Sequence, residues 1–233
     1  MLCWLQRPRR RRRPPQEGAE LASEVPHVSP YAELEPPEIL ARNLQVGARL
    51  ASAALAFALL AFVFAYLYLR TLNSNGDWRP KHVDPSAGIG VAMLVCLVGC
   101  VLAYRYGVLR LGDGTEPGWR RGAVAALTLG LGAFGLVIAQ FAAIGFGPTS
   151  GGYASVFIGW HAFYGLALLF VLYWLEVLVA QSLHTHTQEV VPPESGDIAA
   201  PFELMRPAGD AFAIALYTAV AFGVLGWILL YAA

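Results

Sequence analysis

Residues 122–175 contain no aspartate, glutamate, lysine or arginine, and this uncharged stretch limits the fold more than any other feature of the sequence. A helix that crosses the hydrocarbon core of a bilayer needs about 20 apolar residues, so the stretch is long enough for two crossings and must turn back once. The turn is expected at residues 145–152, where several glycines and Pro148 interrupt helix formation. Three further uncharged runs are each long enough for about one crossing: residues 50–69, 87–104 and 211–233.

The composition of the chain agrees with a membrane protein. Hydrophobic residues make up 57% of the chain and charged residues 14%, against about half and about a quarter in soluble domains. The apolar excess, the lack of a glycine repeat and the count of 3 cysteines exclude disordered, collagen-like and disulfide-framework proteins. Backbone groups in lipid must be satisfied within their own segment, which favours helices. The sequence therefore predicts an all-α membrane protein with five transmembrane helices, near residues 48–70, 88–110, 121–146, 153–182 and 209–232.

Arginines are concentrated before the first predicted span and around the loop between the second and third spans. Loops rich in arginine stay in the cytoplasm, so both regions are expected inside the cell. Five spans that start inside place the N-terminus in the cytoplasm and the C-terminus outside. The loop at residues 183–208 should also be cytoplasmic. It is mainly acidic, but acidic residues carry little weight in this rule and do not contradict that position. The arginines concerned are Arg7, Arg9 to Arg13, Arg42 and Arg49, and then Arg105, Arg110, Arg120 and Arg121.

Residues 1–40 are polar and rich in proline, and they lack the apolar stretch of a cleaved signal peptide. We expect a disordered cytoplasmic tail here, followed by the membrane domain at residues 41–233. The run from Arg9 to Arg13 is interpreted as a topology signal on a solvated arm. Contact of this run with anionic lipid, an acidic partner or nucleic acid is the weaker alternative, and no nucleic-acid partner is expected.

His161 is the one histidine inside a predicted span. Counted from Tyr153 at the outer surface, it lies about 12 Å deep, where an imidazole needs a hydrogen-bond partner. An ionisable group at this depth is a functional-site hypothesis. The alternative is a neutral imidazole bonded to the neighbouring helix that carries Gln140, a second polar residue in the outer half of the membrane.

Glu176 is placed differently by the same counting. It lies roughly 35 Å from Tyr153, at the cytoplasmic interface, where Tyr173 and Trp174 form part of an aromatic belt. We interpret it as an interfacial carboxylate, with a proton relay as the weaker alternative.

The remaining sulfur and imidazole groups do not form a ligand set in the sequence. Cys96 and Cys100 lie four residues apart on one helix face, a spacing that favours close helix packing over metal binding. His184 and His186 offer two ligands without a nearby third, which favours a role in interfacial solvation over metal binding. Small residues recur at the same spacing in two other spans: Gly135, Ala139, Ala143 and Gly147, and then Ala219 and Gly223. We expect no catalytic residue, metal or cofactor site in this chain.

Three segments resemble the five-span bacterial form of subunit III of haem-copper oxidases. The first is residues 41–47 followed by residues 62–70, which end in the family's pattern of alanine, tyrosine, aromatic, tyrosine, leucine and arginine, with Trp78 and Pro80 just beyond. The second is the glycine-aromatic stretch 132–140, which ends in glutamine. The third is residues 152–161, similar to the family's motif of tyrosine, serine and phenylalanine followed by glycine and histidine. The resemblance covers about residues 41–182.

The resemblance implies a non-redox accessory subunit in a bacterial plasma membrane. Such a subunit contacts oxidase subunits I and II and phospholipids, stabilises the catalytic subunit and supports proton uptake during cytochrome c oxidation and oxygen reduction. Haem and copper would belong to the partner subunits. The residues expected to make structural, lipid or subunit contacts are Tyr66, Arg70, Gln140, Tyr153, His161, Tyr164 and Glu176.

The chain also departs from the family pattern. No glutamate stands near Leu55 or Ala143, Tyr164 replaces the family's second histidine, and the usual motif before the last helix is missing between Phe202 and Asp210. The sequence is therefore identified as a divergent member, without the roles in proton buffering or lipid binding that those acids have in the family.

Three other functions remain open at this point. One is a subunit-III-like protein associated with nitric oxide reductase, which the sequence separates poorly from the oxidase form. Another is a small transporter or channel, although the spans have few polar groups and no inverted repeat of broken helices. The last is a separate structural or assembly protein.

Overall fold

The computed structural model describes residues 37–73, 78–79, 83–184 and 201–232, with the side chains of residues 37, 184 and 201–204 left aside. Most of the predicted tail at residues 1–40 therefore lies outside the described part of the chain. Its last four residues, 37–40, are helical and belong to the membrane domain rather than to the tail.

All regular structure in the described residues is helical. Each of the five long helices is long and apolar enough to cross a membrane, so the predicted number of spans is confirmed. The last helix ends in a π-helical turn, η2. The elements are α1 (Pro37–Leu72), α2 (Ala87–Gly112), α3 (Glu116–Ala143), α4 (Gly152–His184), α5 (Pro201–Trp227) and η2 (Ile228–Ala232).

The turn between α3 and α4 lies where the glycines and Pro148 predicted it. Helix α3 ends at Ala143, and α4 begins at Gly152 directly after Gly151, whose φ of 134° is costly for residues with a side chain. Helix α3 begins at Glu116, earlier than predicted, because Pro117 occupies its first turn, where the missing N–H of proline breaks no helical hydrogen bond.

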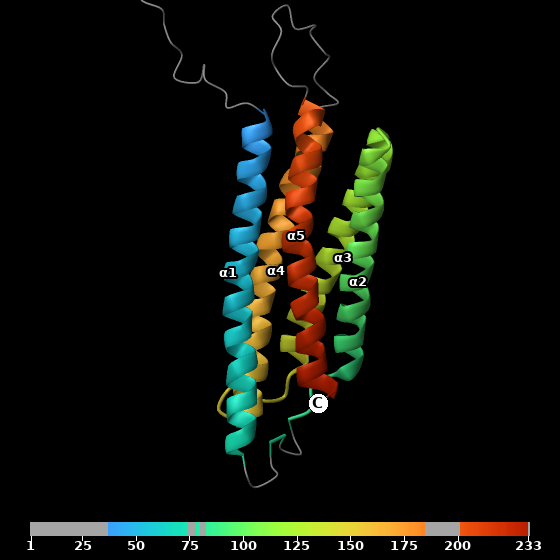
Figure 1. The fold of residues 1–233 in the computed structure, drawn as a ribbon. Helices are drawn as coiled ribbons and strands as arrows, with labels where there is room; N and C mark the ends of the chain where they lie inside the picture. The colour runs from blue at the N-terminus through green and yellow to red at the C-terminus, as the bar shows by residue number, and fades with distance from the viewer. Residues whose placement is uncertain (1–36, 74–77, 80–82, 185–200, 233) are drawn as a thin grey trace, which may run out of the picture. The chain divides into compact units, whose positions relative to one another are not determined.

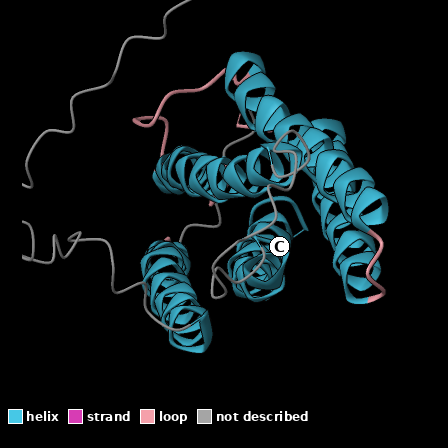
Figure 2. Cartoon of the chain, turned by 90° about the horizontal axis from the view of Figure 1, so that it is seen from above, coloured by secondary structure: helices cyan, strands magenta, loops and turns pink. Residues whose placement is uncertain are grey.

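The five helices run alternately up and down, and α4 and α5 occupy the middle of the bundle (Figure 1). Helix α1 packs on α4 and α5, whereas α2 packs on α3 and α5. Seen along the helices, the bundle has the α2 and α3 pair on one side and α1 on the other (Figure 2). We call the end where α1, α3 and α5 begin the N-side, and the opposite end, where α5 finishes, the C-side.

Helices α2 and α3 make their closest approach near the N-side, at Gly107 and Gly122. A Cβ atom added to Gly122 would lie 2.5 Å from the Cα atom of Gly107 and 2.8 Å from the carbonyl oxygen of Ala103. Backbone therefore contacts backbone, which requires glycine on α3 at this level. Cys96 and Cys100 face the same interface nearer the C-side. Their sulfur atoms lie close to the positions that a Cβ would take at Gly132 and Gly130, respectively. The predicted packing role of the two cysteines is thus confirmed.

The row of small residues buried in α3 is not the one that the spacing suggested. Gly135, Ala139 and Ala143 are exposed, and a Cβ added to Gly135 meets nothing within 4 Å. The buried row lies on the other side of the helix and consists of Gly122, Ala126, Gly130 and Ala133. In α5, by contrast, Ala219 and Gly223 are buried as expected.

Helix α5 is held by three tyrosine hydroxyls at three levels of the bundle. Tyr104 of α2 donates a hydrogen bond to the carbonyl oxygen of Gly209 at 2.6 Å. Two tyrosines of α4 do the same: Tyr164 donates to Ala219 at 3.1 Å and Tyr153 to Leu230 at 2.5 Å. The three acceptors are about three helical turns apart, so the anchors are spread along α5 and the η2 turn that follows it.

Candidate functional site

Aromatic residues from three separate segments meet at the C-side. The indole ring of Trp78, in the link after α1, packs edge-on against Tyr66 of α1 and Tyr153 of α4, with ring centroids 5.4 Å and 6.0 Å apart. Arg70, one turn beyond Tyr66, donates a hydrogen bond to the Tyr66 hydroxyl at 2.9 Å. We call Tyr66, Trp78 and Tyr153 the C-side aromatic cluster.

The link between α1 and α2 is fixed to the same cluster by Arg79. Its guanidinium group lies 5.4 Å from the centroid of the Tyr153 ring, a cation–π distance. Its Nε atom is 3.0 Å from a carboxylate oxygen of Asp84. Because the side chains of Arg79 and Asp84 are 38% and 71% exposed, the pair itself adds little stability, and its main effect is to orient Arg79 over the ring.

His161 lies two turns along α4 from Tyr153 and is buried. Its Nδ1 atom is 2.9 Å from the carbonyl oxygen of Phe157, and its Nε2 atom is 3.3 Å from the hydroxyl of Tyr231 in η2. A carbonyl oxygen only accepts hydrogen bonds, so Nδ1 carries a proton. The Tyr231 hydroxyl can donate to Nε2 of a neutral imidazole, and each ring nitrogen thus has a partner.

The alternative of a hydrogen bond from His161 to a neighbouring helix is met by Tyr231 of η2, not by the helix that carries Gln140. Helix α3 does lie beside His161, but through the ring of Phe141, whose centroid is 6.3 Å from that of the imidazole. Successive helical residues point about 100° apart, so Gln140 faces another direction when Phe141 faces α4.

Gln140 is only 2% exposed, and neither atom of its side-chain amide has a hydrogen-bond partner among the described residues. A buried amide without partners destabilises a folded protein, because it has lost its hydrogen bonds to water. The indole nitrogens of Trp78 and Trp227, at the C-side, are also buried without a hydrogen-bond partner among the described residues.

Replacing Gln140 with leucine is expected to stabilise the isolated protein by about 1 to 2 kcal/mol, because it removes an unsatisfied buried amide and keeps the volume. Thermal unfolding in detergent measures the change. Gln181→Leu, at an exposed position of α4, is the control and should leave the midpoint unchanged. A lower unfolding temperature for Gln140→Leu would show that the amide is engaged in the native protein.

The other two predicted site residues lie away from the cluster. Tyr164 is buried in the middle of the bundle, where its hydroxyl reaches α5 and leaves no room for a side chain at Gly223. Glu176 is exposed nearer the N-side, in a groove of about 440 Å³ between α3 and α4. Of the predicted residues, the structure therefore brings Tyr66, Arg70 and Tyr153 together around Trp78, whereas Gln140, His161, Tyr164 and Glu176 lie elsewhere.

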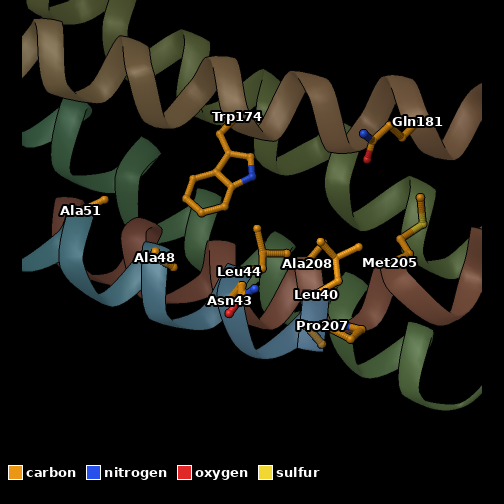
Figure 3. A pocket seen from close by; sticks show the side chains of 12 residues that line it. Leu40, Asn43, Leu44, Ala48, Ala51, Trp174, Gln181, Met205, Pro207 and Ala208 are labelled. Carbon is orange, nitrogen blue, oxygen red and sulfur yellow. The ribbon is translucent and has the colours of Figure 1, made fainter. Parts of the chain in front are cut away.

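A cleft at the N-side lies between α1, α4 and α5, which the sequence analysis missed. It has a volume of about 690 Å³ and an apolar lining, and Trp174 projects into it from α4 (Figure 3). A second space of about 250 Å³ shares Ala51 and Trp174 with it and continues along α1 to Ser52 and Leu55. The signal in the sequence is the group of small residues on α1, Gly47, Ala48 and Ala51, which keep α1 from filling the space.

No group of three or more metal-ligating side chains occurs in the described residues. Cys96 and Cys100 are free thiols. The side chain of His184 and all of His186 lie outside the described part, so the pair is not placed by the structure.

No protein-family model matches the chain, and no curated protein matches it either. The resemblance to subunit III therefore depends on the motif residues alone.

Proposed function

We propose that this chain is a non-redox accessory subunit of a haem-copper terminal oxidase in a bacterial plasma membrane, similar to the short form of subunit III. The observation that carries the proposal is the C-side aromatic cluster. Tyr66 and Trp78 belong to the first segment of the resemblance and Tyr153 to the third, and the Trp78 ring contacts both tyrosines. Their role here is packing, which is what an accessory subunit without a reaction centre requires.

The N-side is proposed to face the cytoplasm. Among the described residues, seven arginines lie in the N-side parts of the helices and two lie at the C-side. Positive residues are retained on the cytoplasmic side, which supports this orientation. The N-side group is Arg42, Arg49, Arg105, Arg110, Arg120, Arg121 and Arg206, and the C-side group is Arg70 and Arg79.

Reporter fusions test this orientation. Alkaline phosphatase fused after Ala233 is expected to be active, since the C-side faces outward, whereas green fluorescent protein at the same position should be dark. Fusions truncated after Gly114, in the turn between α2 and α3, should give the reverse pattern. Phosphatase activity at Gly114 would contradict the proposed orientation.

The exposed row Gly135, Ala139 and Ala143 on α3 is the proposed contact with the catalytic subunit. Small residues let transmembrane helices approach closely, and this row lies on a part of α3 that the bundle itself leaves uncovered. The N-side cleft, on the cytoplasmic side in this orientation, suits phospholipid acyl chains because its lining is apolar. Haem and copper belong to the partner subunits in this proposal.

Copurification tests the proposed function. The tagged protein, extracted in mild detergent, is expected to bring down a partner with a haem spectrum and bound copper. Gly135→Leu with Ala139→Leu should reduce the recovered haem about tenfold or more while the isolated chain stays folded, because leucine blocks close helix approach. Ala53→Leu, at an exposed position of α1, is the matched control and should leave recovery unchanged. A chain that purifies without any haem-containing partner would contradict the proposal.

A further inference from the structure

We propose that the groove between α3 and α4 binds a phospholipid whose headgroup carries a primary ammonium, such as phosphatidylethanolamine, with Glu176 as the headgroup ligand. The inference needs only that the chain spans a membrane, and it adds a specific headgroup to the phospholipid partners proposed above. Seven residues line the groove: Leu127 and Leu131 of α3, and Leu169, Phe170, Leu172, Tyr173 and Glu176 of α4.

The groove opens to the lipid side of the bundle. Phe170 and Tyr173 are each about two thirds exposed, at 66% and 65%, and both helices are long and apolar enough to span the membrane. The polar groups of the lining, the Glu176 carboxylate and the Tyr173 hydroxyl, belong to its N-side half, and the remaining lining is apolar. A ligand that fits must therefore be apolar along most of its length and polar at one end.

Glu176 lies deeper in the membrane than the arginines of α3. Leu172 of α4 packs against Gly130 of α3, so Glu176, one turn nearer the N-side, is level with about residue 126. This level is about 8 Å further from the N-side than Arg121. A carboxylate at the edge of the hydrocarbon needs a cation or hydrogen-bond donors.

No side chain in the described part of the protein supplies that cation. Glu176 takes part in none of the ion pairs among these residues, which are Arg79 with Asp84, Arg110 with Asp113 and Arg120 with Glu116. Arg120 lies on the same face of α3 as Leu127 and Leu131, and is thus the best-placed arginine. Its guanidinium group is already bonded to Glu116, so the positive partner of Glu176 must come from the surroundings.

The shape of the groove favours a lipid chain over a helix from a partner subunit. A helix is about 10 Å wide, and its backbone approaches a neighbour most closely at small residues. The walls of this groove are instead leucine, phenylalanine and tyrosine, around a volume of about 440 Å³. An acyl chain fits such a groove, and an ammonium at its head end donates hydrogen bonds to the carboxylate.

Native mass spectrometry of the isolated full-length chain tests the proposal, with phosphatidylethanolamine and phosphatidylcholine of identical acyl chains as probes. Choline lacks N–H groups, so the wild type is expected to bind the ethanolamine lipid about tenfold more tightly. Glu176→Gln should remove this preference. Leu131→Trp, which fills the groove but keeps the carboxylate, should weaken the binding of both lipids.

Glu38→Gln is the matched control, because Glu38 is an exposed carboxylate at the same side of the bundle but on α1. It should behave as the wild type. Equal affinity for the two lipids in the wild type would overturn the proposal, and so would a preference that survives Glu176→Gln. Crosslinking of position 176 to a partner's transmembrane segment, without lipid preference, would overturn it in favour of a protein contact. Because the test uses the isolated chain, its failure would leave the oxidase proposal standing.

Discussion

Replacing Gly122 with alanine is expected to destabilise the bundle more than any other single methyl group added to the protein. The new Cβ would lie 2.5 Å from Cα and 2.6 Å from the backbone nitrogen of Gly107, and backbone atoms of a helix cannot rotate out of the way. Helices α2 and α3 would have to move apart along their whole interface. Overpacking of this kind costs about 3 kcal/mol, which corresponds to a decrease of about 5 to 10 °C in the unfolding temperature.

The control for this substitution lies on the same helix. Gly135→Ala adds the same methyl group where nothing lies within 4 Å, so any change in helix propensity is included while the clash is absent. Thermal unfolding of both variants in the same detergent isolates the effect of the clash between position 122 and the backbone of Gly107. Equal midpoints for the two variants would mean that α2 and α3 do not touch at Gly107.

Replacing Gly226 with alanine is the second substitution with a large expected effect. The added Cβ would overlap the indole ring of Trp160, which is buried between α4 and α5 and packs edge-on against Phe62 of α1. A side chain can shift, so the expected cost, about 1 to 3 kcal/mol, is smaller than at Gly122. Thermal unfolding in detergent again measures the change.

A double-mutant cycle identifies Trp160 as the cause. Trp160→Phe removes the part of the indole that meets position 226 and is itself expected to destabilise by leaving a cavity. The double variant should be less destabilised than the sum of the two single changes, since alanine at 226 fills part of the space. Strict additivity would show that the ring and Gly226 are not in contact.

The number of helices and the turns between them followed from the sequence because both depend on local properties. An uncharged run of sufficient length must cross the membrane whatever its neighbours are, and the glycines and Pro148 fix the turn at residues 145–152. The packing of Cys96 and Cys100 was also predicted, because two positions four residues apart share one face of a helix.

Contacts between helices were harder to predict, because they depend on how each helix is rotated about its axis. Helix α3 carries two rows of small residues, and either row suits a close contact. The sequence favoured the row with Gly135, whereas the bundle buries the row with Gly122. The same rotation places Phe141 rather than Gln140 against His161.

The tyrosine bonds to α5 had no signal in the sequence, since every residue offers a carbonyl oxygen as an acceptor. Tyr164 illustrates the difficulty. In the sequence, Tyr164 stands where the family has its second histidine and was interpreted as a departure from the family pattern. In the structure, its hydroxyl donates a hydrogen bond to the middle of α5.

These bonds also limit how α5 can move. The acceptors at Gly209 and Ala219 of α5, and at Leu230 of the η2 turn continuous with it, are held by donors on α2 and α4, which do not travel with it. Sliding α5 along its axis by even one turn would break all three bonds in the same step, with no intermediate position that keeps two of them. The three hydrogen bonds thus fix the axial position of α5 relative to α2 and α4. A signal cannot pass through this bundle by a piston motion of α5.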